Sequence, residues 1–270
     1  MKVLNSLRTL ALTASCAALV WTGAIAADCG KGEYGNPGIA APHSQPYGLT
    51  YGEWSAVWWQ WEYALPVPKN PLFMDGNVDL SLNQPEGPVW FLGGTFSPTV
   101  MTTEILGKAD RTGTVPQGKA LFFPILNSEL DNPTDPAPDE TYPGNYTIAE
   151  LRAQCKAGID SVVGMECEID GVSVKNLSDP LTTPYRAVAP TFRYWLPPKN
   201  NVQQSFGLDV SGWIYPAEAD GVFLMLEPLA VGKHTIHFAG EFPGTLPFIL
   251  DITYHITVVP CRGDRDGDRH

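Results

Sequence analysis

The apolar residues that follow position 50 recur at helical intervals. One face of such a helix would carry Trp54, Val57, Trp58, Trp61 and Leu65. Thr50 and Glu53 have the spacing of a capping box, and the prolines at 66 and 68 would end the helix. The pattern predicts a helix over residues 51–64 with Trp59 and Tyr63 on the side away from its core face.

A second capping box, at Thr147 and Glu150, predicts a helix over residues 148–156 that Gly158 ends. The other apolar segments are short and bounded by glycine and proline, which is typical of strands. They cover residues 89–92, 120–126, 167–174, 222–226, 233–238 and 249–259. Asp170-Gly171 lies inside one of them and predicts a hairpin with a type I′ turn.

Strands outnumber helices in this pattern, and the gaps between them rarely leave room for a crossover helix. We therefore predict a mainly β fold, an antiparallel, jelly-roll-like β-sandwich with two peripheral helices and long loops. It would form a single domain over residues 27–270, with an irregular arm at 27–46 and a frayed tail at 262–270.

The first 26 residues have the three parts of a secretory signal peptide. Lys2 and Arg8 are basic, residues 10–21 are apolar, and Ala24-Ile25-Ala26 is a small-x-small cleavage pattern. A membrane anchor is one alternative, but this apolar run is shorter than the ~20 residues that span a bilayer. A lipid-attachment signal at Cys29 is another, but Asp28 stands where a small residue is needed. We expect a secreted or periplasmic protein that does not span a membrane.

The chain is acidic. Its formal net charge is −12, and a chain cleaved after Ala26 would lose two basic and no acidic residues and carry −14. Such a chain does not neutralise phosphates, so we expect no nucleic-acid partner, and anionic membrane surfaces are disfavoured for the same reason. Neither charge nor composition indicates the oligomeric state.

Four cysteines remain once Cys16 leaves with the signal peptide. An even number in an exported chain indicates two disulfides, for which three pairings exist. We prefer Cys155–Cys167, which closes a short loop between a helix and a strand, and Cys29–Cys261, which ties the chain ends together. A zinc site competes with this interpretation, but no two cysteines have a close ligand spacing.

Several segments resemble parts of a group of uncharacterised exported bacterial proteins. They are the Trp-rich helix at 51–64, the stretch VPQGKALFFP at 115–124, the Asp170-Gly171 hairpin and residues 219–238. The resemblance covers most of the chain after residue 26. Its motifs are structural in character and imply no activity.

Two C-terminal strands place His237, His255 and Asp251 on polar faces, because alternate residues of a strand point to opposite sides. If these strands pair, the three side chains could approach one another and form a divalent transition-metal site for zinc, copper or iron. The alternative is a solvated face with a cross-strand polar ladder. No short-spaced ligand motif supports the metal.

A second candidate site is aromatic. Trp59 and Tyr63 lie off the core face of the first predicted helix. Arg193 and Trp195 alternate along the chain with apolar residues, so their side chains would point away from the core. Exposed rings bind the apolar faces of sugars, so these four residues are candidates for binding a glycan. The alternative is that Trp59 is buried beneath the long loops.

A third candidate is the proline-rich, acidic stretch 127–143, which we interpret as a long loop. Its carboxylates could hold Ca²⁺, and they belong to Glu129, Asp131, Asp135, Asp139 and Glu140. The EF-hand pattern is absent, so a solvated loop is the alternative.

The sequence contains no G-x-S-x-G, H-E-x-x-H, P-loop or dinucleotide-binding motif, which disfavours the common hydrolase and nucleotide-binding classes. Our first hypothesis is a non-enzymatic protein that binds an extracellular carbohydrate or cell-envelope glycan. The second is a metal-dependent extracellular enzyme that acts on a polymer through His237, His255 and Asp251. The third is a structural envelope protein.

Overall fold

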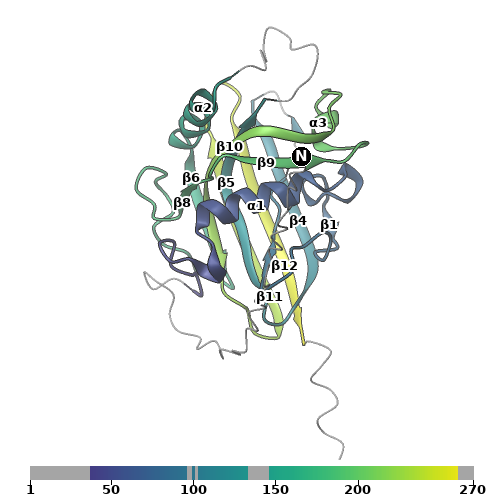
Figure 1. The fold of residues 1–270 in the computed structure, drawn as a ribbon. Helices are drawn as coiled ribbons and strands as arrows, with labels where there is room; N and C mark the ends of the chain where they lie inside the picture. Colours follow the sequence, from purple (N-terminus) through teal and green to yellow (C-terminus); the bar gives the residue numbers. More distant parts are fainter. Residues whose placement is uncertain (1–36, 96–98, 101–102, 133–145, 261–270) are drawn as a thin grey trace, which may run out of the picture.

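The computed structural model describes residues 37–95, 99–100, 103–132 and 146–260 (Figure 1). Its helices are α1 (Tyr51–Tyr63), α2 (Ile148–Asp160) and α3 (Val202–Ser205), with 3₁₀ turns η2 (Pro46–Gly48), η3 (Val67–Lys69) and η4 (Pro71–Phe73). Its strands are β1 (Gly76–Asn77), β2 (Val89–Phe91), β3 (Thr99–Val100), β4 (Ile105–Pro116), β5 (Ala120–Asp131), β6 (Val163–Ile169), β7 (Val172–Ser173), β8 (Arg186–Val188), β9 (Phe192–Leu196), β10 (Gly212–Leu226), β11 (Gly232–Phe242) and β12 (Phe248–Val259).

The strands form two sheets, so the prediction of a mainly β fold is confirmed. The large sheet has seven strands in the order β1-β4-β12-β11-β6-β7, with β3 also paired to β4. The small sheet has five strands in the order β2-β5-β10-β8, with β9 also paired to β10. No helix in the described residues combines the length and the apolar character that crossing a membrane requires.

The predicted antiparallel sandwich is confirmed only in part, because both sheets are mixed. β4 and β12 run parallel along their whole length, and β2 runs parallel to β5. Parallel neighbours need a long connection, and here β5 to β11 lie between β4 and β12 in the chain, so no dedicated crossover helix is required. This strand order does not establish a jelly roll.

The two sheets pack face to face through apolar side chains. The ring centroids of Phe123 on β5 and Phe238 on β11 lie 5.3 Å apart, and both residues are fully buried. Gly240 on β11 allows a close approach to β5, because a Cβ atom there would lie 2.7 Å from Cδ1 of Leu126. The main core therefore lies between the sheets.

Helix α1 begins at the predicted capping box and ends at Tyr63, one residue before the predicted end. It is not peripheral. All its tryptophans and Tyr63 are buried, including Trp59, which lies off the predicted core face. One side packs on the small sheet, with Trp58 against Phe223, and Trp61 bonds to the loop carbonyl of Leu82. Figure 1 shows α1 running across the strands.

Helix α2 begins at its capping box but continues through Gly158 to Asp160, so the predicted end at 156 is wrong. α2 packs on β5 at Gly158, where a Cβ atom would make an ordinary contact with Ser128, 3.6 Å from its Oγ. Ile159 is fully buried, and its packing extends the helix past a residue that commonly ends one.

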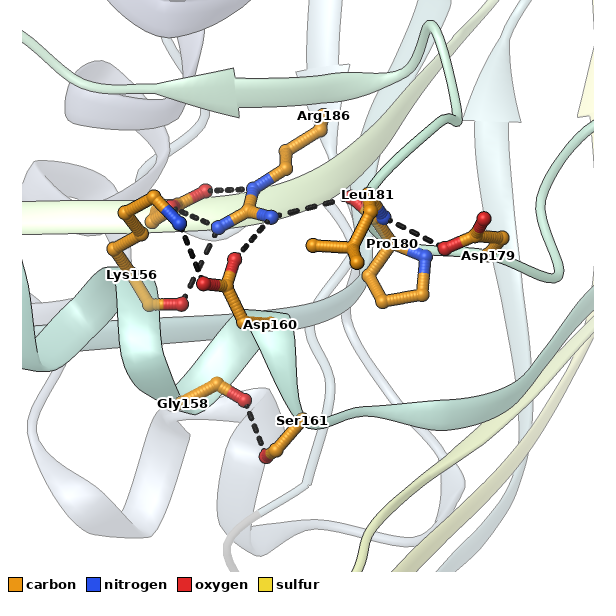
Figure 2. A network of polar contacts seen from close by, with 9 residues as sticks. Lys156, Gly158, Asp160, Ser161, Asp179, Pro180, Leu181 and Arg186 are labelled. Carbon is orange, nitrogen blue, oxygen red and sulfur yellow. Dashed lines mark hydrogen bonds and ion pairs between the residues drawn. The ribbon is translucent and has the colours of Figure 1, made fainter.

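Arg186 on β8 anchors the end of α2 (Figure 2). Its guanidinium makes a two-pronged contact with Asp220 on β10, at 2.7 and 3.0 Å, and reaches Asp160 at 2.7 Å. It also donates to the carbonyls of Lys156 and Pro180. The Asp220 side chain is only 3% exposed, so Arg186 compensates a buried charge.

We expect Arg186→Met to lower the free energy of unfolding by about 3 kcal/mol, because it leaves the buried Asp220 carboxylate without its partner. Lys156→Met is the matched control: its ammonium belongs to the same network but is 61% exposed, so the loss should stay below about 1 kcal/mol. Urea denaturation of both variants measures the difference. Equal losses would contradict a buried role for Arg186.

The predicted Asp170-Gly171 hairpin is confirmed between β6 and β7, with φ angles of 50° and 80° at the two turn residues. The predicted loop at 127–143 is wrong at its start, because residues up to Asp131 continue β5. Asp135, Asp139 and Glu140 lie outside the described residues.

Cys155 and Cys167 are free, buried thiols, so the predicted bridge between them is not present. Sγ of Cys155 on α2 lies 3.2 Å from the carbonyl oxygen of Glu218 on the small sheet. Cys167 lies on β6 in the large sheet, paired with Phe238. The helix that carries Cys155 thus packs on the small sheet, whereas the strand that carries Cys167 belongs to the large sheet. Cys29 and Cys261 lie outside the described residues.

We expect alkylating reagent at pH 8 to leave Cys155 and Cys167 unmodified in the native protein and to modify both in denaturant without reductant. Burial raises the pKa of the Cys155 thiol to about 12 and raises that of Cys167 as well, so neither forms a thiolate while folded. Peptide mass mapping identifies the modified residues. Protection of both in denaturant until reductant is added would show that they are oxidised.

Candidate functional site

The polar residues Asn127, Glu129 and Asp131 form a row on one face of β5, beneath the C-terminal half of α1. Alternate residues of a strand share a face, which brings the three together. Their partners across the ladder on β10 are small, namely Gly221, Ala219 and Ala217. Small partners leave room above the sheet for α1 and β9.

Tyrosine hydroxyls bond to two of these carboxylates. Tyr63 on α1 donates to Oε2 of Glu129 at 2.6 Å, and Tyr194 on β9 donates to Oδ2 of Asp131. Gln203 on α3 donates to the same Asp131 oxygen at 3.2 Å. The two tyrosine rings lie 4.3 Å apart, so α1, β9 and β5 meet in one hydrogen-bonded cluster.

This cluster favours the protonated form of Glu129. Burial raises the pKa of Glu129 well above its usual range, and the neighbouring Asp131 carboxylate raises it further. Burial and the same carboxylates also raise the pKa values of Tyr63 and Tyr194. The carboxyl groups therefore act here as hydrogen-bonding partners inside the fold rather than as the exposed oxygens of a calcium loop.

A cavity of about 390 Å³ adjoins this polar row. Trp59 and Asn127 both line it, and the other lining residues are Trp58, Leu72, Gly94, Thr95, Ile105, Pro124, Ile125, Leu126, Phe206, Phe242, Phe248 and Leu250. Nε1 of Trp59 and Nδ2 of Asn127 are both buried without a hydrogen-bond partner. The cavity therefore has a mainly apolar wall, and two of the residues that line it each carry a buried, unpaired N–H donor.

A second buried acid, Glu62, lies on the other side of α1. Burial raises the pKa of its carboxyl to about 8, against the lowering effects of the Arg111 charge and of N–H groups from Leu72 and Asn70. Neither carboxyl oxygen makes a hydrogen bond of standard geometry. Arg111, also fully buried, directs its donors to Tyr254 and to three backbone carbonyls instead.

We expect Glu62→Gln to flatten the pH dependence of stability. The pKa of Glu62 is higher in the folded chain than in the unfolded one, so its contribution is fullest below about pH 4.5 and is lost as the pH rises towards 8. Between pH 5 and 8 the wild type should lose up to about 3–4 kcal/mol that the variant keeps. Denaturant unfolding across this range measures it.

Glu166→Gln is the control for Glu62→Gln, because Glu166 lies on the exposed side of β6. It should retain the wild-type pH profile. Superimposable profiles for the wild type and Glu62→Gln would rule out a buried, protonated Glu62.

Three exposed aromatic residues lie on the β9–β10 strand pair, and we call Trp195, Trp213 and Tyr215 the aromatic strip. Their side chains are 43%, 57% and 60% exposed. Trp195 and Trp213 are direct cross-strand partners whose rings meet edge to face at 5.6 Å. The guanidinium of Arg193 lies 4.5 Å from the Trp213 ring centre. The strip is therefore a solvent-facing aromatic surface with one cation beside it.

Only two of the four residues predicted to bind a glycan lie on the surface. Arg193 and Trp195 belong to the aromatic strip, whereas Trp59 and Tyr63 are 3% and 5% exposed and cannot form a surface platform. Trp213 and Tyr215 were not among the residues predicted from the sequence. The alternation Trp213-Ile214-Tyr215 was the available signal, because it repeats the alternation around Trp195 on the partner strand.

The structure brings only two of the three predicted metal ligands together. Nε2 of His237 lies 3.1 Å from Asp251, whose other oxygen binds Lys108 at 3.0 Å. His255 lies 3.3 Å from Asp110 on β4 instead. Lys108 and, to a smaller extent, His237 lower the pKa of Asp251. Within the described ranges no group of three His, Cys, Asp or Glu residues could hold a metal ion, and this face forms a polar ladder.

Comparison with protein-family models, with curated proteins and with solved structures finds no match for this chain. Its function is therefore to be inferred from the geometry of the molecule.

Proposed function

We propose that the protein is an exported, non-enzymatic binding protein whose ligand is an extracellular carbohydrate or cell-envelope glycan. The aromatic strip is the binding surface. The observation that carries the proposal is the exposure of Trp195, Trp213 and Tyr215 on one strand pair, with Arg193 beside them.

The chemistry of the strip suits a sugar. Pyranose rings present apolar C–H faces, which pack on exposed indole and phenol rings. The guanidinium of Arg193 offers N–H donors to sugar hydroxyl or carboxylate oxygens. Contiguous exposed apolar surface marks interaction sites, and here the exposed rings of Trp195 and Trp213 meet edge to face.

The strip also has a firm base. The residues that alternate with it, Tyr194 and Ile214, are buried beneath it. Gln60 on α1 donates to the backbone carbonyl of Arg193 at 2.8 Å. A platform held by the core loses little conformational freedom when a ligand binds.

A metal-dependent enzyme is the weaker candidate. Each of His237, His255 and Asp251 already has a polar partner, and His255 lies next to Asp110 rather than next to the other two. A metal there would have to displace these contacts.

We expect Trp213→Ala and Trp195→Ala each to weaken glycan binding by at least about tenfold, because each removes one stacking surface. Trp213→Phe should retain part of the affinity, since a smaller ring remains. A glycan array with the wild type selects the ligand, and calorimetry with that ligand measures the variants.

Leu181→Ala is the control for these variants, because Leu181 is 66% exposed and lies outside the strip. It should bind like the wild type, and all variants should melt within a few degrees of it. Absence of binding to every arrayed glycan, or equal affinity after loss of either tryptophan, would refute the proposal.

A further inference from the structure

The cavity beside Trp59 has the composition of a ligand site and is separate from the aromatic strip. We infer that it binds a small, neutral, mainly apolar molecule that carries a hydrogen-bond acceptor, such as the carbonyl oxygen of a ketone or an ester. This inference does not depend on the proposed glycan binding, because the two sites share no residue.

The cavity lies where α1 and the ends of both sheets meet. Trp58 and Trp59 come from α1, residues 124–127 from β5, and Phe242 and Phe248 from the facing ends of β11 and β12. Its volume of about 390 Å³ falls within the range of small-molecule sites, roughly 300–1,000 Å³. Phe206, after α3, is 59% exposed, so the wall of the cavity reaches solvent there.

The strongest indication of a ligand is the unpaired Trp59. The other tryptophans of α1 each donate their indole N–H to a backbone carbonyl, at 2.8 Å for Trp54, 2.9 Å for Trp58 and 3.0 Å for Trp61. Nε1 of Trp59 is equally buried and has no partner. Buried donors in native proteins are almost always paired, so this exception needs an explanation.

Asn127 is a second, independent case of a buried donor without a hydrogen-bond partner. Its Nδ2 is buried without a partner, and the residue lines the same cavity from the opposite element, β5. Both unpaired groups are donors. A carbonyl oxygen accepts hydrogen bonds through two lone pairs and donates none, so it complements such a site better than a hydroxyl or an amine.

The other residues that line the cavity indicate the charge of the ligand that it would accept. None of them is Lys, Arg or His, so an anion would enter without a counter-charge. None is Asp or Glu either, and the neighbouring Glu129 has a raised pKa. A neutral molecule is the class that this wall accommodates.

The test uses three probes of similar shape: 2-acetonaphthone, which has a ketone oxygen, 2-ethylnaphthalene, which lacks it, and 2-naphthoate, which is charged. We expect the ketone to bind the wild-type protein with 1:1 stoichiometry and at least about tenfold more tightly than either of the other two. In a ¹H–¹⁵N spectrum the ketone should shift the indole N–H signal of Trp59, which Trp59→Phe identifies by its loss.

Three variants locate the site. Trp59→Phe keeps an aromatic ring of smaller size and Asn127→Leu keeps a branched side chain, and each removes a donor. Each should therefore reduce the preference for the ketone over the hydrocarbon. Gly94→Leu should abolish binding of both probes by filling the cavity, since a Cβ atom there has no neighbour nearer than 3.9 Å. Trp213→Ala, which alters the aromatic strip alone, should bind the ketone like the wild type.

Tighter binding of the ketone that both donor variants lose would establish the site. Equal binding of ketone and hydrocarbon would overturn the inference, because the unpaired donors would then play no part. Tighter binding of 2-naphthoate would overturn the neutral class, and absence of binding by any probe to the folded wild type would overturn the site itself. Loss of glycan binding with retained ketone binding, or the reverse, separates the two proposals.

Discussion

The enclosure of α1 is the constraint on which most of this structure depends. Burying a helix with four tryptophans takes a large apolar area out of water, but each indole also brings an N–H group that needs an acceptor. Trp54, Trp58 and Trp61 find theirs in the carbonyls of Pro46, Leu92 and Leu82. The helix thereby holds three separate connecting segments against the small sheet.

The same enclosure explains why titratable groups lie inside the fold. Glu62 and Tyr63 belong to a helix that is covered nearly all round, so their partners must also be internal. Glu129 accepts a hydrogen bond from Tyr63 at 2.6 Å. Arg111 lies near Glu62, but its N–H groups donate to backbone carbonyls and to Tyr254 instead. Desolvation shifts both glutamate pKa values upwards because neither acid has a cation bonded to it.

Two places in the molecule depart from ordinary packing, and they do so in opposite ways. The aromatic strip exposes large rings to water, whereas a surface without a binding role would carry polar residues there. The cavity beside Trp59 leaves polar N–H groups without partners where a core would pair them. A bound ligand would remedy each departure, which is why the two proposals concern these places and not the polar face of the large sheet that carries Lys108 and Asp251.

The sequence by itself determined the local elements: both capping boxes, the start of each long helix, the Asp170-Gly171 turn and the mainly β character. These follow from interactions within a few residues, which a pattern records directly. Only the tertiary structure decided that β4 and β12 run parallel, that Trp59 is enclosed, that Trp213 joins Trp195, and that His255 turns to Asp110. Those outcomes depend on which distant segments come into contact. The pattern of apolar and polar residues in one segment does not show which residues of other segments will lie next to it.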